Sequence, residues 1–417
     1  MINITTFISK SSVLRTNASF RKFWCVEIFS TLAFQMLAVT IGWQMYALTH
    51  DAFKLGLVGL AEFAPMVLLT LIGGQVADRF NRPKIILVCQ LTECVVILFL
   101  AISSIGDWIQ SYHILVAAVL FGSARAFENP ASSAMIPSLV NRAGLPEAAA
   151  WHSSAGQTAS ILGPALGGIL IVFAPSVVYV TSLIAVLFSA SLISRIKVIH
   201  TYQNEETANV ESLLTGLLFV FKRKIILGTI SLDLFAVLLG GATALLPIFS
   251  KDVLQTGSWG LGLMRTAPAI GALLMSLLLT RFSIQHSVGK YLFSSLAVFG
   301  ISTIVFGISN NLVLSLTALF FIGASDVVSV VIRSTIVQLN TPLEMQGRVG
   351  AINSLFIGTS NQLGEFESGM MAGWFGAVRA TVIGGAGSIA IAILWMYLFP
   401  SLRTMKTYYA EESKKTE

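Results

Sequence analysis

Ionisable side chains lie inside long apolar stretches of this sequence, where water would be out of reach if the stretches cross a lipid bilayer. They are Glu27, Glu62, Glu93, Arg125, Glu128, Asp233, Arg265, Asp326, Arg333, Glu365 and Glu367. A charge near the centre of a bilayer costs at least about 2 to 3 kcal/mol, so each of them is a functional candidate. Carboxylates in such places can exchange protons, and arginines can hold anions or keep a neighbouring carboxylate ionised. The pattern therefore indicates binding and proton chemistry inside a membrane.

The composition supports a membrane location for these stretches. The chain is 55% hydrophobic and 11% charged, whereas soluble domains are about 25% charged. Apolar windows recur that, as helices of about 20 residues, would span a hydrocarbon core of about 30 Å. We expect spans at roughly 23–48, 54–77, 84–105, 113–137, 146–173, 175–195, 225–250, 257–282, 288–308, 311–337, 347–375 and 377–399. The prediction is an all-α membrane protein with twelve transmembrane helices and no soluble catalytic domain.

One polar segment divides these spans into two sets of six. It predicts an N-terminal six-helix half at 1–195, a cytoplasmic linker at 196–224 and a C-terminal half at 225–417 with a short charged tail. A shift of about 200 residues superposes Gly163 on Gly364 and Arg125 on Asp326, as parallel six-span repeats would. The two halves are therefore predicted to be pseudo-symmetric.

The basic residues predict the orientation of the chain. When alternate loops are assigned to opposite sides, most of the 26 Lys and Arg residues fall on one side. By the positive-inside rule that side is cytoplasmic, and both termini lie there. The net charge of +6 is then explained by topology, so we expect no nucleic-acid partner.

A charged turn separates the second and third expected spans. It reads Gly74-Gln-Val-Ala-Asp78-Arg79-Phe-Asn81-Arg82-Pro83-Lys84. The spacing of its Gly, Asp and basic residues resembles motif A of the major facilitator superfamily. Asn81 stands where that family usually has Gly, and Pro83 where a second Arg is common. We expect Asn81 to replace the Gly because Asn tolerates a left-handed backbone.

The resemblance implies a gate at this turn. Asp78 would cap the helix that begins near Gly347-Arg348, because a helix N-terminus carries partial positive charge. The contact would hold the cytoplasmic side shut in one conformation. The predicted gating motif comprises Gly74, Asp78, Arg79, Arg82, Lys84, Gly347 and Arg348. The alternative is that Asp78 is a solvated loop acid that only helps to set the topology.

Two further segments resemble more specific motifs. Gly163-Pro164-Ala-Leu-Gly167-Gly168 resembles the core of motif C, which is associated with exporters of this superfamily; small residues and Pro allow close helix packing and a bend. The alternative is ordinary small-residue packing. The stretches 125–131 and 341–349 resemble the subgroup that contains enterobactin-type siderophore exporters and macrolide efflux proteins.

The major facilitator resemblance also implies which buried charges face a central cavity, because spans 1, 4, 7 and 10 line it in that fold. Substrate-cavity candidates are Arg125, Glu128 and Arg333, and proton-coupling candidates are Asp326, Asp233, Glu62 and Glu27. Glu27 lies close enough to one end of its span that snorkelling to water is an alternative. Glu128 is expected to contact Arg82 in a local charge network. His152, Trp43 and Trp151 could form an aromatic cargo site or serve as packing.

Arg125 and Asp326 occupy equivalent places in the two repeats and could face each other across the cavity. A carboxylate beside an Arg stays ionised, and one that loses its Arg in a low dielectric takes up a proton. The pair would then act as a proton-sensitive latch. The alternative is a static buried pair that fixes helix register.

These observations and the resemblance together predict a proton-coupled exporter of a small molecule, with a siderophore as the leading cargo. Rivals are a multidrug or macrolide pump, a lysophospholipid flippase and a membrane scaffold without transport. No Walker-type loop, zinc-ligand spacing or nucleophile elbow occurs, so we expect a transporter and not an enzyme, with no cofactor and no metal. The expected partners are the cargo, protons and the lipid of a bacterial cytoplasmic membrane, and the expected functional form is a monomer.

Overall fold

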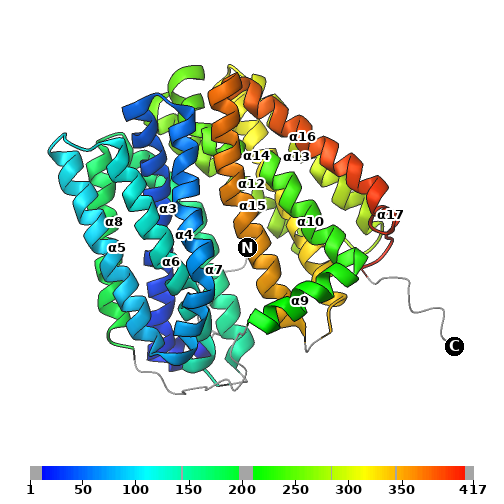
Figure 1. Ribbon diagram of the computed structural model, residues 1–417, viewed down its shortest axis with the longest axis horizontal. Coiled ribbons are helices and arrows are strands. Elements are labelled where there is room, and N and C mark those ends of the chain that lie inside the picture. The colour runs from blue at the N-terminus through cyan, green and yellow to red at the C-terminus, as the bar shows by residue number, and fades with distance from the viewer. Residues whose placement is uncertain (1–11, 142–143, 197–209, 283, 343–344, 409–417) are drawn as a thin grey trace. The chain divides into compact units, whose positions relative to one another are not determined.

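The computed structural model describes residues 12–141, 144–196, 210–282, 284–342 and 345–408, and the regular elements within them are helical (Figure 1). The helices that correspond to the first six expected spans are α3 (Ala18–Thr49), α4 (Ala52–Arg79), α5 (Arg82–Ile105), α6 (Ser111–Leu139), α7 (Leu145–Ile171) and α8 (Pro175–Ile193). The second set is α10 (Lys224–Leu239), α12 (Gly257–Arg281), α13 (Val288–Ile308), α14 (Leu312–Leu339), α15 (Gln346–Phe375) and α16 (Ala377–Leu398). Short helices α2 (Ser12–Thr16) and α17 (Pro400–Arg403) flank the two sets.

Within the described residues, nine helical segments are long and apolar enough to cross a membrane. Helices α6, α7 and α15 are not among them, although they contain 29, 27 and 30 residues. They are more polar, and α6 and α15 carry several of the ionisable candidates. Buried polar residues thus lower the apparent hydropathy of helices that are long enough to span.

The seventh expected span is interrupted. Helix α10 ends at Leu239, and the chain continues through a 3₁₀ turn η2 (Ala242–Leu245), α11 (Leu246–Ile248) and a π-helical turn η3 (Phe249–Val253). A Cβ placed on Gly241 would lie 2.6 Å from the carbonyl oxygen of Gly364. Gly240 and Gly241 therefore end the regular helix α10 and let the backbone approach α15 closely.

The polar segment 196–224 contains a helix that was not expected. Helix α9 (Val210–Lys222) packs against α15 and α10 (Figure 1). Val220 of α9 is buried in a cluster with Ile226, Ile230, Val349 and Ile352. A segment that the sequence presents as a linker thus contributes to a hydrophobic core.

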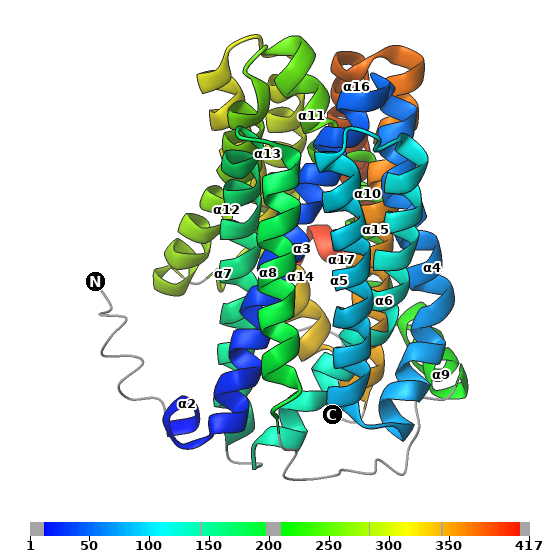
Figure 2. The ribbon, with the colours of Figure 1, turned by 90° about the vertical axis from the view of Figure 1, so that its left-hand side faces the viewer.

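The chain forms two compact units. Unit 1 comprises Met1–Leu48 and Ala61–Ala208, and unit 2 comprises Thr49–Leu60 and Asn209–Glu417. In unit 1, α5 lies between α6 and α8 (Figure 2). The first turns of α4 belong to unit 2, where a Cβ on Gly56 would lie 2.9 Å from the Cα of Gly369 in α15.

Asn81 starts α5 as a helix cap. Its backbone is extended, with φ −66° and ψ 108°, and its Oδ1 accepts a hydrogen bond from the backbone N–H of Lys84 at 3.2 Å. The expectation of a left-handed backbone at this position is wrong. Asn is favoured here because it satisfies an N–H that has no partner in the helix, and Pro83 suits the first turn, where its missing N–H costs nothing.

Helices α4 and α6 cross at backbone distance in unit 1. A Cβ on Gly73 would overlap the carbonyl oxygen of Ala126, and one on Gly122 would overlap the carbonyl oxygen of Glu62. Gly residues at a helix crossing allow this approach because no side chain separates the two backbones. The crossing places Glu62 beside α6.

We expect Gly73→Ala to lower the free energy of unfolding by about 1 to 3 kcal/mol, the usual effect of overpacking. Gly74→Ala is a matched control, since nothing lies within 4 Å of the added Cβ and Ala favours a helix over Gly by about 1 kcal/mol. Thermal unfolding of the two purified variants in detergent measures the difference. Equal midpoints would contradict the close crossing.

Candidate functional site

Arg125 of α6 is held between two carboxylates in unit 1. Its Nε lies 3.5 Å from Oε1 of Glu93 on α5, and its NH1 lies 3.8 Å from Oε2 of Glu128, one turn along α6. The guanidinium also lies over the ring of Phe34 on α3, 4.1 Å from its centroid. The Arg125 side chain is 13% exposed and the two carboxylates are 4% and 6% exposed. A cation–π contact and two ion pairs therefore stabilise a largely buried charge.

Neutral side chains complete the contacts of Glu128. Its Oε1 accepts hydrogen bonds from Gln90 Nε2 at 3.0 Å and from Ser30 Oγ at 3.4 Å. Gln90 and Glu93 lie one turn apart on α5, so both reach Glu128 and Arg125 from the same helix face. Helices α3, α5 and α6 thus meet at this polar centre.

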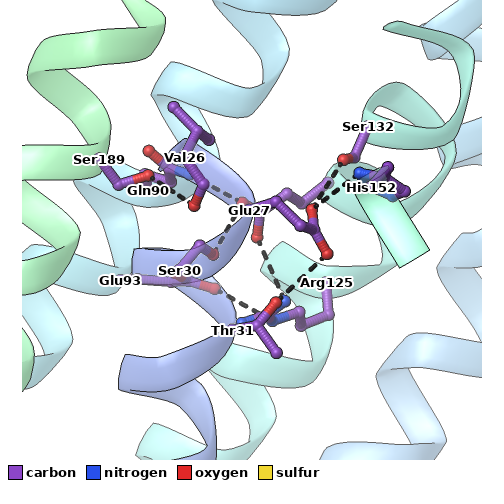
Figure 3. A network of polar contacts seen from close by, with 11 residues as sticks. Val26, Glu27, Ser30, Thr31, Gln90, Glu93, Arg125, Ser132, His152 and Ser189 are labelled. Atoms are coloured by element: carbon purple, nitrogen blue, oxygen red, sulfur yellow. Dashed lines mark hydrogen bonds and ion pairs between the residues drawn. The ribbon is translucent and has the colours of Figure 1, made fainter. Parts of the chain in front are cut away.

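Glu27 of α3 joins the centre to α7. Its Oε2 lies 3.7 Å from His152 Nδ1 and accepts a hydrogen bond from Ser132 Oγ at 3.5 Å, as Figure 3 shows. Its Oε1 accepts from Thr31 Oγ1 at 3.3 Å. His152 stacks on Phe23 with a centroid distance of 5.5 Å. Glu27 thus contacts specific side chains, so snorkelling to water alone does not describe its position. We call Glu27, Gln90, Glu93, Arg125, Glu128 and His152 the Arg125 cluster.

The Arg125 cluster borders a cavity of about 150 Å³. Glu27, Arg125, Glu128 and His152 contribute to its wall, together with Asn129. A polar cavity of this size admits water. The ion pairs are too long to be hydrogen bonds, and within the described structure the facing atoms of Glu93, Arg125, Glu128 and His152 have no hydrogen-bond partner. Separation of Arg125 from Glu93 and Glu128 therefore breaks no hydrogen bond between them, whereas movement of Glu128 away from Gln90 breaks one of 3.0 Å.

The charges of the cluster do not balance. Glu27, Glu93 and Glu128 are three carboxylates, whereas Arg125 is the one cation that is always charged. Protonated His152 would leave one negative charge in excess, and Glu62 of α4 adds to the negative field on Arg125. An excess buried carboxylate favours the bound proton because a low dielectric penalises uncompensated charge. The arrangement can therefore bind and release at least one proton.

Unit 2 holds a smaller cluster with the same imbalance. Arg333 NH1 of α14 forms an ion pair with Asp233 Oδ1 of α10, and its Nε donates to Ser329 Oγ at 3.0 Å. Asp326 lies two turns before Arg333 on α14, and both line a pocket of only about 10 Å³ together with Asp233. Two carboxylates thus share one guanidinium. The expected pairing of Asp326 with Arg125 would join the two units and stays a prediction.

Three further candidates lie apart from both clusters. Glu365 of α15 and Arg265 of α12 are close enough to interact electrostatically within unit 2. A Cβ on Gly59 of α4 would lie 3.1 Å from Glu365 Oε2. Glu367 accepts a long hydrogen bond of 3.5 Å from its neighbour Ser368. Glu365 thus lies near Arg265 of α12 and against the first turns of α4, whereas the hydrogen-bond partner of Glu367 is its own neighbour.

The charged turn is only partly described. The side chain of Asp78 is not described, nor is the exposure of Gly347. The predicted gate contact of Asp78 therefore stays a prediction. Arg82 NH1 donates to the Ala134 carbonyl at 2.9 Å and to Ser138 Oγ at 2.5 Å. The expected contact of Arg82 with Glu128 is wrong in the described structure, because Arg82 instead ties the start of α5 to the end of α6.

The other residues of the predicted gate lie at the ends of their helices. Arg79 and Lys84 are exposed at the end of α4 and the start of α5, and Gly74 lies near the end of α4. Arg348 stands in the first turn of α15 and packs beside Gly216 of α9. Basic residues thus lie at the junction of α4 and α5 in unit 1 and in the first turn of α15 in unit 2.

The glycines of the motif at 163–168 are packing positions. A Cβ on Gly163 would lie 2.5 Å from Gln35 Cβ, and one on Gly167 would lie 3.1 Å from the Met36 carbonyl oxygen. Pro164 and Gly168 lie between or beside them within α7 and are buried. The motif brings α7 against α3, the helix that carries Glu27.

Three members of the Arg125 cluster do not stand out in the sequence as cavity residues. Glu93 lies in the third expected span, which the major facilitator resemblance does not place at the central cavity, and Gln90 is a neutral residue of the same span. His152 was grouped with aromatic residues. The useful signal was the one-turn spacing of Gln90 and Glu93 inside an apolar stretch, which places two polar groups on one helix face.

Comparison with known proteins identifies the family and the fold. The family described as transmembrane secretion effector matches residues 8–416. Enterobactin exporters of Escherichia coli O1:K1 and Citrobacter koseri are 23% identical over 409 residues, 97% of both chains. Among solved structures, a bacterial homologue of the human lysosomal transporter Spinster covers 94% of this chain and 99% of its own (TM-score 0.73, 12% identity). The nucleoside transporter NupG covers 92% and 99% (TM-score 0.69, 14% identity).

We expect Arg125→Gln to lower the free energy of unfolding by about 3 to 5 kcal/mol, because it leaves buried carboxylates without a counter-charge. Adding Glu93→Gln and Glu128→Gln should restore much of the loss. Arg379→Gln, which removes an exposed Arg, is the control. Thermal unfolding in detergent measures the series, and an Arg125→Gln variant as stable as the control would show that the cluster does not depend on this cation.

Proposed function

We propose that this chain, which belongs to the transmembrane secretion effector family, exports a small molecule in exchange for protons. It is a multi-pass transporter of the major facilitator superfamily and not an enzyme. The observation that carries the proposal is the excess of buried carboxylates over arginines beside a polar cavity. An excess acid in a low dielectric loads a proton readily and releases it when water or a cation reaches it. Such a group can couple a pH gradient to a conformational change.

The Arg125 cluster is the proposed proton site of unit 1. Its ion pairs are long and it faces a cavity, so protonation of Glu93 weakens the attraction of α6 for α5 at little cost in hydrogen bonding. Glu128 is held more firmly, because it also accepts a hydrogen bond from Gln90 of α5. Glu27 and His152 provide a route from the cavity to these acids, with Glu62 nearby. In unit 2, Asp326 lines the pocket with Arg333 but forms no salt bridge with a described residue, so it serves as a second proton candidate beside Asp233.

Alternating access would link the proton to the cargo. We propose that both termini face the cytoplasm of a bacterium, that the chain acts as a monomer in the inner membrane, and that Asp78 closes the cytoplasmic side in one state. The contact of α7 with α3 at Gly163 and Gly167 gives the exporter-type motif a physical role, because a backbone contact permits sliding without displaced side chains.

A siderophore is the proposed cargo. Full-length similarity to enterobactin exporters supports this choice. Arg125 lines the cavity, and a guanidinium can bind an anionic oxygen pair bidentately once it leaves its carboxylates. Catecholate or carboxylate chelators present such oxygen pairs.

A cationic drug is the second candidate cargo. Glu27 and Glu128 also line the cavity, and a lipophilic cation would compete with a proton for these carboxylates. The ring of His152, which also lines the cavity and stacks on Phe23, gives a flat cation an aromatic neighbour when the imidazole is neutral.

Deletion of the gene should separate the two cargoes. Siderophore export predicts that the deletion strain releases less iron chelator into its culture medium, with unchanged susceptibility to cationic drugs and macrolides. Drug export predicts the opposite pattern. Chelator assay of the medium and minimal inhibitory concentrations measure the two outcomes, and complementation with the intact gene is the control.

Glu93→Gln should remove proton coupling while the cargo path remains. In proteoliposomes the wild type should transport faster when the side that receives the cargo is acidic, and Glu93→Gln should lose this dependence but keep exchange of labelled for unlabelled cargo. Glu367→Gln, which lies outside both clusters, is the matched control. If Asp326→Asn loses coupling and Glu93→Gln does not, the working proton site lies in unit 2.

A further inference from the structure

A large apolar groove lies in unit 1, outside the Arg125 cluster. Helices α4, α5 and α6 enclose about 690 Å³, within the range of about 300 to 1,000 Å³ found for ligand pockets. Its wall comprises Val76, Phe80, Asn81, Lys84, Ile85, Val88, Cys89, Thr92, Leu120, Ser123, Ala124 and Phe127.

The wall is apolar even where its residues carry hydroxyl groups. Thr92 Oγ1 donates to the Val88 carbonyl at 3.0 Å, and Ser123 Oγ donates to the Val119 carbonyl at 2.7 Å. Both hydroxyls are therefore satisfied by their own helices. Few hydrogen-bonding groups of the groove wall remain for a polar or highly charged cargo. A hydrocarbon chain needs no such partner, so its burial there carries no polar desolvation cost.

The groove opens on the surface that faces lipid. Val88 is 62% exposed and Phe80 is 65% exposed. Val95, seven residues beyond Val88 on the same side of α5, is 68% exposed. Exposed apolar residues along a membrane-spanning helix lie against acyl chains.

The charge of the groove is one-sided. Among the described residues that line it, Lys84 is the one that carries a charge, and its exposed side chain stands at the start of α5 beside Asn81. Arg79, at the end of α4, is also exposed. A Lys can lay its aliphatic stem along an apolar wall while its ammonium group stays at the membrane surface. The wall of the groove is thus apolar, and a cationic side chain lies at the end of the groove where α5 begins.

We propose that this groove binds an anionic phospholipid, with the headgroup phosphate at Lys84 and an acyl chain along Val88, Cys89 and Leu120. The lipid comes from the leaflet at the charged turn, which the distribution of basic residues places on the cytoplasmic side. The site is separate from cargo binding and does not depend on the identity of the cargo.

Native mass spectrometry of the full-length, delipidated protein tests the proposal, with phosphatidylglycerol and phosphatidylcholine of identical acyl chains as probes. Phosphatidylglycerol should bind more tightly by about fivefold, the contribution of one basic side chain to an anionic surface. Lys84→Gln should abolish the preference. Lys290→Gln is the matched control, since Lys290 is the exposed third residue of α13 as Lys84 is of α5.

A second pair of variants tests the acyl-chain part of the groove. Val88→Trp should fill the groove and reduce phosphatidylglycerol binding, whereas Val95→Trp, on the same helix face but outside the groove wall, should not. Both positions are exposed, so neither substitution disturbs the core. Equal binding of the two lipids by the wild type, or wild-type binding by both Lys84→Gln and Val88→Trp, would overturn the proposal.

Discussion

An unequal number of buried acids and cations is the constraint on which the rest of unit 1 depends. Glu93, Glu128 and Glu27 lie around Arg125 with side chains that are mostly buried. Each uncompensated charge would be expensive there. Neutral side chains donate hydrogen bonds to these carboxylates: Gln90 and Ser30 donate to Glu128, and Thr31 and Ser132 donate to Glu27. Helices α3, α5, α6 and α7 are thus joined through one electrostatic centre.

The two units resolve a similar imbalance in different ways. In unit 2, Arg333 pairs directly with Asp233 and is tied to Ser329, around a pocket of about 10 Å³. In unit 1, Arg125 makes longer contacts beside a cavity of about 150 Å³. Long ion pairs that border a polar cavity rearrange more easily than a pair that protein atoms enclose. The physical expectation is that unit 1 is the more responsive half.

Backbone contacts at glycines make these charge contacts possible. Gly73 and Gly122 hold α4 against α6, and Gly163 and Gly167 hold α7 against α3. The close approach of α7 to α3 brings His152 within 3.7 Å of Glu27. Phe80 and Phe127 line the groove that remains between α4, α5 and α6.

Hydropathy and the placement of ionisable residues determined much of this protein from sequence alone. Twelve apolar stretches and the Gly74–Lys84 motif were sufficient for the superfamily and fold, because a bilayer admits few ways to satisfy a backbone. Only the tertiary structure decided which charges meet. Glu93, His152 and Arg125 lie on three different helices, and their proximity depends on helix rotation and crossing, which no local pattern encodes. Arg82 likewise contacts Ser138 and not Glu128, because packing at the helix ends sets its direction.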